Sequence, residues 1–153
     1  MNSHEGCALF QQEDLIKSFI EFKNGIEGGL KMLTYAITFI SLACLLYTIG
    51  VWAEKIQNKL MGWHVFVFWG GFIFDTLGTS AMGILSGGIF QANFHGITGM
   101  IAILLMLFHA IWASIVIIRK DENMKLNFHK FSIVVWIIWL IPMVSGIIYG
   151  VTI

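Results

Sequence analysis

Residues 94–118 read FHGITGMIAILLMLFHAIWASIVII, a stretch that contains no Asp, Glu, Lys or Arg. A helix rises about 1.5 Å per residue, so roughly 20 apolar residues cross the hydrocarbon core of a bilayer. Three other stretches are similarly apolar and long, and the sequence therefore predicts four membrane-spanning helices. Their ranges are 33–52, 63–85, 94–118 and 131–153.

The overall composition supports a membrane protein. Of the 153 residues, 58% are hydrophobic and 12% are charged, with a mean hydropathy of +0.81, whereas a soluble domain has about 45–50% apolar and about 25% charged residues. The spans are too long and too continuous for barrel strands, and short connections make neighbouring helices antiparallel. We therefore predict an all-α fold, a single integral membrane four-helix up-down bundle surrounded by lipid.

Several function classes are excluded. Nine basic residues balance nine acidic ones, which leaves no global field to attract nucleic acid. The two cysteines, Cys7 and Cys44, cannot build a disulfide framework, and no CxxC is present for structural zinc. The sequence also lacks a phosphate-binding loop, HExxH, GxSxG and kinase signatures, so nothing indicates a hydrolase, kinase or transferase.

The positions of the cations predict the orientation. Basic residues occur in the connections 53–62 and 119–130 but not in 86–93. Because cytoplasmic connections carry the excess of Lys and Arg, we expect these two connections in the cytoplasm and the C-terminus outside. The cations concerned are Lys55, Lys59, Arg119, Lys120, Lys125 and Lys130.

The N-terminal tail, residues 1–31, is too polar for a fifth span, and its lysines would lie on the outer side against the charge rule. Four apolar residues follow helical spacing, which suits an amphipathic interfacial helix. They are Leu15, Phe19, Phe22 and Ile26. The alternative is that Glu27-Gly28-Gly29 translates a purine-rich ribosome-binding site ahead of Met32, and we expect the native chain to start at Met32.

Histidines lie on three of the predicted helices, beside small residues. Positions seven apart share a helix face, which aligns His64 with Gly71, His95 with His109, and His129 with Met143. Small residues at this spacing also suit close helix packing alone. An imidazole in hydrocarbon, however, needs a hydrogen-bond partner or a metal. Histidines from three helices favour a planar ligand between them, haem b held through axial nitrogens.

Depth in the membrane predicts which histidines pair. His64 and His129 lie near the cytoplasmic interface, and His109 lies about 15 Å deeper. We expect one haem in this inner half, with two of these three imidazoles on its iron. His95 lies about 21 Å from His109 along the same helix, a spacing similar to that of membrane b-type cytochromes. A second, outer haem at His95 would be five-coordinate or would use Met82 or Met143.

Other residues are candidates for supporting roles. Gly70 and Gly71 would leave room for a porphyrin, and Arg119 and Lys130, with Lys120, would meet its propionates or serve only to set the topology. Asp75 is the only acidic or basic residue within the spans, and such a group usually faces a partner.

The role of Asp75 has three interpretations. The first is that it orients an axial imidazole, and the second is that it relays protons. The third is that it is protonated because it is buried and serves only in packing. Thr76, Thr79, Ser80 and His109 are its expected partners.

Three ordered motifs resemble the haem-sensing membrane protein (HsmA-type) family. They are WHVFVFWGGFIFDTLGTSAMG from Trp63, FHGITGMIAILLMLFHAIWA from Phe94 and FHKFSIVVWIIWLIP from Phe128. The resemblance covers the chain from about Met32 onward. It implies a small bacterial inner-membrane protein that binds haem and contributes to tolerance of haem and oxidative stress. It also implies that His64, His95, His109 and His129 occupy the family's histidine positions and Asp75 its acidic one.

The expected function is therefore haem capture, with transmembrane electron transfer as a further role, and with an electron donor or a second copy as partner. One alternative is a small proton-coupled transporter that uses Asp75 and the histidines without a cofactor. Another is a structural or sensory subunit whose glycine-rich faces pack against a partner.

Overall fold

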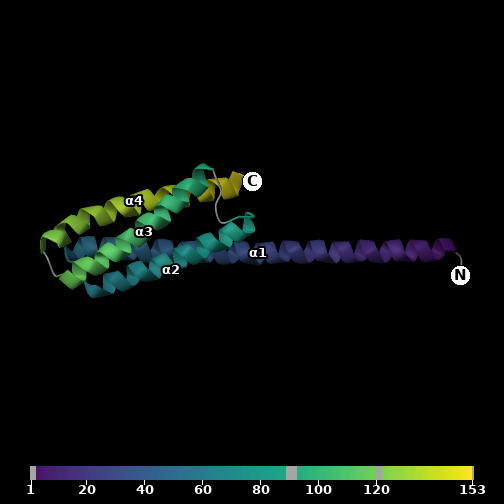
Figure 1. The fold of residues 1–153 in the computed structure, drawn as a ribbon, viewed down its shortest axis with the longest axis horizontal. Coiled ribbons are helices and arrows are strands. Elements are labelled where there is room, and N and C mark those ends of the chain that lie inside the picture. The colour runs from purple at the N-terminus through teal and green to yellow at the C-terminus, as the bar shows by residue number, and fades with distance from the viewer. Residues whose placement is uncertain (1–2, 89–92, 120–121, 153) are drawn as a thin grey trace.

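The computed structural model describes residues 3–88, 93–119 and 122–152, and these form four α-helices and no strand. The helices are α1 (Ser3–Gln57), α2 (Gly62–Leu85), α3 (Phe94–Arg119) and α4 (Glu122–Thr152). Figure 1 shows them running up and down beside one another. The predicted all-α four-helix bundle is confirmed.

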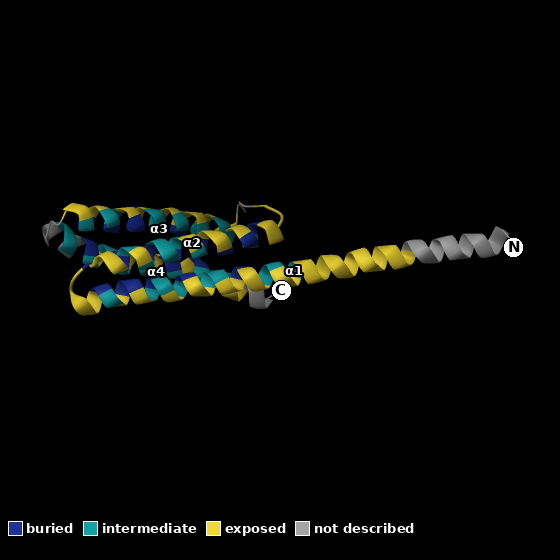
Figure 2. Ribbon diagram, turned by 90° about the horizontal axis from the view of Figure 1, so that it is seen from below, coloured by how far each residue is buried: buried dark blue, intermediate teal, exposed yellow. Residues whose placement is uncertain are grey.

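Each helix packs against the next one in the chain, and α4 returns to contact α1. In the described chain all four helices are long and apolar enough to cross a membrane. Figure 2 shows buried residues on the inward faces of the helices and exposed residues on the outward faces. The outward faces are rich in Ile, Leu and Phe, as expected where the surroundings are lipid. The chain is a multi-pass membrane protein.

Two of the helices extend beyond the predicted spans. The second and third spans agree with α2 and α3 to within one residue, but α1 continues to Gln57 and α4 begins at Glu122 instead of residue 131. The predicted connection 119–130 is therefore mostly helix. Hydropathy detects only the apolar part of a helix. The Lys, Glu and Gln residues beyond it are good helix formers, and no Pro or Gly interrupts the helix there.

Specific residues set the helix ends. Asn58, with φ of 45°, ends α1 in the left-handed conformation that Asn tolerates. Gly87, with φ of +80°, follows α2, and the Gly88 N–H donates to the Gly83 carbonyl at 2.9 Å, which satisfies a carbonyl of the last turn. Asn93 caps α3, since its Oδ1 accepts from the Gly96 N–H at 2.8 Å.

The N-terminal tail, for which an amphipathic interfacial helix is one interpretation, is a continuous part of α1 from Ser3 onward, and the native start at Met32 stays a prediction. With 55 residues, α1 is about 80 Å long. Its N-terminal part projects beyond the bundle (Figure 1), and the large apolar side chains between Leu15 and Leu30 are exposed.

Two names are used below. The basic end of the bundle is the end that carries the α1–α2 and α3–α4 connections, together with Lys55, Lys59, Arg119 and Lys130. The basic half is the half of the bundle at this end, around His109. The hollow half is the other half, around Asp75 and His95, and it contains the cavities described next.

Candidate functional site

The core of the basic half is filled by aromatic rings. Phe68 from α2 and Phe128 from α4 are fully buried. Their ring centroids lie 4.5 Å and 5.1 Å from the imidazole of His109, which is itself 1% exposed. Contacts this close leave no layer between the imidazole and its neighbours for a porphyrin.

The space expected beside Gly70 and Gly71 is also filled. A Cβ added to Gly71 would meet the ring of Tyr47 at 2.6 Å, and one added to Gly70 would meet Leu46 at 3.5 Å. Side chains of α1 therefore lie beside both glycines, and their role in making room for a porphyrin stays a prediction. Their small size lets α1 and α2 approach closely, which is the common role of glycine between membrane helices.

His64 serves as a helix cap. Its Nδ1 accepts a hydrogen bond from the Met61 N–H at 2.9 Å, at the start of α2. A neutral imidazole nitrogen that accepts carries no proton, so the proton of His64 lies on Nε2. A ligand that binds iron through Nε2 needs the opposite tautomer. This geometry opposes the expected ligand role of His64.

His129 and His109 also have protein partners. His129 Nδ1 lies 3.3 Å from Glu54 Oε1, and His109 Nε2 lies 3.0 Å from Ser132 Oγ. Ser132 lies beside the Glu54 carboxylate. A buried polar cluster of Glu54, His129, Ser132 and His109 thus joins α1, α3 and α4. The inner haem site with two of the three imidazoles stays a prediction, since each ring has another contact here.

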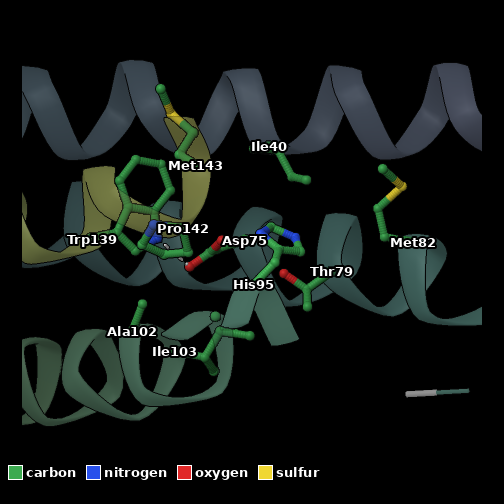
Figure 3. Close-up of a pocket in the computed structure, with 11 residues that line it drawn as sticks. Ile40, Asp75, Thr79, Met82, His95, Ala102, Ile103, Trp139, Pro142 and Met143 are labelled. Carbon is green, nitrogen blue, oxygen red and sulfur yellow. Dashed lines mark hydrogen bonds between the residues drawn. The ribbon is translucent and has the colours of Figure 1, made fainter. Parts of the chain in front are cut away.

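The hollow half contains the described cavities. A cavity of about 80 Å³ lies among α1, α2, α3 and α4, and Asp75, His95, Met82 and Met143 all line it. Figure 3 draws Asp75, His95 and Thr79 in the middle of the residues that line the cavity, with Met143 and Met82 toward opposite ends. The structure therefore brings the three residues predicted for an outer site to one cavity.

A larger groove adjoins this cavity. It has a volume of about 680 Å³ and is formed by the ends of α2 and α3 and the turn after α2, a volume within the range of small-molecule sites. His95, Thr79 and Met82 line both spaces, as does Gly99, where an added Cβ would meet nothing within 4 Å. A planar ligand has room here that it lacks beside His109.

The tautomer of His95 follows from its partner. Ser145 Oγ donates to the Pro142 carbonyl at 2.9 Å, so its proton is already used. It therefore accepts from His95 Nδ1–H, at 3.0 Å. The lone pair of the neutral ring is then on Nε2. A metal-ligating histidine in proteins usually has its other nitrogen held in this way.

Asp75 has a partner that the sequence did not indicate. The indole N–H of Trp139 donates to Asp75 Oδ2 at 2.8 Å. Thr76, an expected partner, donates instead to the Phe72 carbonyl of its own helix. Tyr47 packs edge-on against Trp139 at 5.1 Å, and its hydroxyl has no hydrogen-bond partner among the described residues. The hydrogen bond described for Asp75 is to this indole, and its role in orienting an axial imidazole stays a prediction.

The predicted propionate partners lie on the surface. Arg119 and Lys130 are both exposed at the basic end, on the far side of the bundle from the hollow half. Lys120 lies outside the described residues. These positions agree with a topological role for the cations.

Sequence reasoning missed Glu54, Trp139 and Ser145. Glu54 lies seven residues after Tyr47 and continues the buried stripe of α1, but the predicted span ended at residue 52, so it was assigned to a connection. Trp139 and Ser145 belong to no sequence motif that indicates a function. Trp139 lies three residues before Pro142, and Ser145 lies three residues after it. Their partners come from other helices, and only the packed bundle identifies them.

No group of three or more His, Cys, Asp or Glu that could hold a metal ion occurs within residues 3–88, 93–119 and 122–152. The chain matches no protein-family model, no curated protein and no solved structure. The resemblance to the haem-sensing family therefore stays a prediction.

Proposed function

We propose that this protein binds haem b in the hollow half of its bundle, with His95 as the histidine ligand. The observation that carries the proposal is the position of His95. Its ring is held through Nδ1 by Ser145, lines one cavity with Met82 and Met143, and borders a groove of about 680 Å³. Among the described histidines, His95 is the one that lines these two spaces.

Two methionines could hold the group together with His95. The thioethers of Met82 and Met143 line the same cavity as His95, and Met with His is an established ligand pair for haem iron. Held by His95 and one methionine, the group would supply electron transfer. The wall residues would exclude water from the ligand, because Ala102, Ile103 and Pro142 are apolar.

Haem b, when bound, supplies an iron that accepts and donates one electron. Binding would also remove free haem from the lipid, where it generates radicals. This agrees with the tolerance of haem and oxidative stress that the family resemblance implies. We also propose the bacterial inner membrane as the location, with the basic end in the cytoplasm, since the charge rule predicts that orientation. An electron donor or a second copy of the chain would be a partner.

A haem titration of the full chain in lipid nanodiscs, followed by absorbance, tests the proposal. Wild-type protein should give a saturable Soret band, and His95→Ala should weaken or abolish it. His109→Ala and the tail variant His4→Ala should keep it, which controls for general damage. If His95→Ala binds haem normally while His109→Ala does not, the inner site is correct and this proposal is wrong.

A colourless protein after growth with added haem, with its helical content intact, would instead favour the proton-coupled or purely structural alternatives.

A further inference from the structure

Glu54 is a carboxylic acid inside the bundle, and the haem proposal does not use it. Its side chain is 2% exposed, although it lies only three residues before the end of α1. A buried carboxylate is costly unless it is paired or protonated. An acid at such a position therefore has a partner or a function.

The pairing of Glu54 is incomplete. Oε1 contacts His129 at 3.3 Å, but Oε2 has no hydrogen-bond partner although it is buried. His109 Nδ1 is equally buried and unpaired. Two orphaned polar atoms in one cluster are unusual, since buried polar groups are nearly always satisfied. A buried carboxylate with one oxygen unpaired is stabilised when it takes up a proton, because the acid form carries no charge into the interior.

The cluster also has a connection to the surface. The side chain of His129 is 26% exposed, while that of Glu54 is 2% exposed. His129 therefore has one side toward the surroundings and Nδ1 toward the buried carboxylate. Beyond Glu54, Ser132 leads to His109 through the 3.0 Å contact of its hydroxyl. The polar groups form a path from the surface at the basic end to the centre of the basic half.

We propose that Glu54, His129, Ser132 and His109 form a proton-uptake site, with His129 as the group that receives the proton from water and Glu54 as the buried acceptor. The outer nitrogen of His129 binds the proton and the ring becomes an imidazolium. The Nδ1–H bond then breaks and an O–H bond forms at Glu54 Oε1. The ring returns to neutral, the carboxylate becomes a carboxylic acid, and one proton has moved inward.

The surroundings leave few other groups to carry out this step. From α4, His129 contacts Glu54 at 3.3 Å, and from α3 the titratable group is His109, reached through Ser132. On α2 the titratable residue at this end is His64, whose Nδ1 is occupied by the Met61 N–H. On α1 the neighbouring Lys55 lies over the Trp52 ring at 4.8 Å, on the exposed surface. No residue of this cluster lines the cavities of the hollow half, so this inference stands without the haem proposal.

Infrared difference spectroscopy of the haem-free full chain in nanodiscs tests the proposal. Acidification should produce a C=O band of a protonated carboxyl group, which shifts in D₂O. The band should be absent in Glu54→Gln, a variant of nearly the same shape. Asp75→Asn removes the other buried carboxyl group and should keep the band. A band lost with Asp75 and kept without Glu54, or no band at all, would overturn the proposal.

A second variant tests the route to the surface and does not depend on whether Glu54→Gln folds. His129→Gln keeps a polar side chain but cannot be protonated. It should slow the exchange of the Glu54 carboxyl proton with D₂O on the order of a hundredfold, the lower end of what a positioned proton-transfer group contributes. Exchange at the wild-type rate would show that His129 does not deliver the proton and would refute the proposed path.

Discussion

The two halves of the bundle place the same kinds of residue in opposite surroundings. His109 and His95 lie on one face of α3, and each contacts a serine of α4 at 3.0 Å. In the basic half, aromatic rings cover the histidine. In the hollow half, the histidine borders open volume. Spacing along a helix therefore predicts the direction of a side chain, whereas the residues on neighbouring helices decide what lies in front of it.

The largest expected effect of this difference concerns packing. Phe68→Ala in the basic half removes a fully buried ring from contact with His109 and Phe128, and we expect it to lower the free energy of unfolding by about 3–5 kcal/mol. Phe94→Ala, at an exposed position in the hollow half, should cost less than about 1 kcal/mol. Reversible unfolding in mixed micelles measures both. Equal costs would mean that the halves do not differ in packing.

The next effect separates the two serine–histidine contacts. Ser145→Ala releases His95 Nδ1, and loss of such a supporting hydrogen bond typically weakens metal binding 10- to 100-fold, which we expect for the haem dissociation constant. Ser132→Ala breaks the equivalent contact at His109 and should leave the haem affinity unchanged. Absorbance titration of both variants makes the comparison. If Ser132→Ala weakened haem binding and Ser145→Ala did not, the haem site would lie in the basic half.

Replacing glycine by alanine should change the free energy of unfolding in opposite directions in the two halves. A Cβ at Gly50 would meet the Phe68 ring at 2.5 Å, so Gly50→Ala should destabilise the protein by about 1–3 kcal/mol through overpacking. Gly99→Ala, where nothing lies within 4 Å, should stabilise it by about 0.5–1 kcal/mol, because Ala favours a helix more than Gly does. The change in melting temperature shows the sign directly, and a destabilising Gly99→Ala would argue that the groove is closed.

The smallest effect compares two indole hydrogen bonds of α4. Trp139→Phe leaves the buried Asp75 oxygen without its donor, while Trp136→Phe removes a bond to the Thr48 hydroxyl at 3.2 Å. Bonds to charged groups contribute more than neutral ones, so the Trp139 variant should be the less stable by about 1 kcal/mol. Thermal unfolding resolves the difference, and equal stabilities would indicate that Asp75 is not charged in the folded protein.

Most of the fold was predictable from the sequence because membrane spans are defined by one property, a long apolar run. The same rule fails where helices extend past the apolar region, as at Glu54 in α1 and Glu122 in α4. The histidine faces were also predictable, since helical periodicity sets them. The occupant of each face was not, because Tyr47 and Leu46 of α1 lie beside Gly71 and Gly70, and the spacing of residues in α2 does not indicate side chains from another helix.

The candidate site illustrates the same limit. His95, Met82 and Met143 were predicted as an outer set and do line one cavity. The tautomer of His95 depends on a serine fifty residues away and on that serine's own bond to Pro142. Two linked hydrogen bonds among three residues of two helices thus set this tautomer, and a single sequence does not indicate such linked bonds.

The groove between α2 and α3 is bordered by exposed residues such as Leu85 and Met100, so it is accessible from the side of the bundle. In a bilayer, acyl chains compete for such a recess whenever no other molecule occupies it. Any affinity measured for the groove will then depend on the surrounding amphiphile, in the way that a competitive inhibitor raises an apparent dissociation constant. Short-chain detergents and native lipids would report different values for one and the same protein.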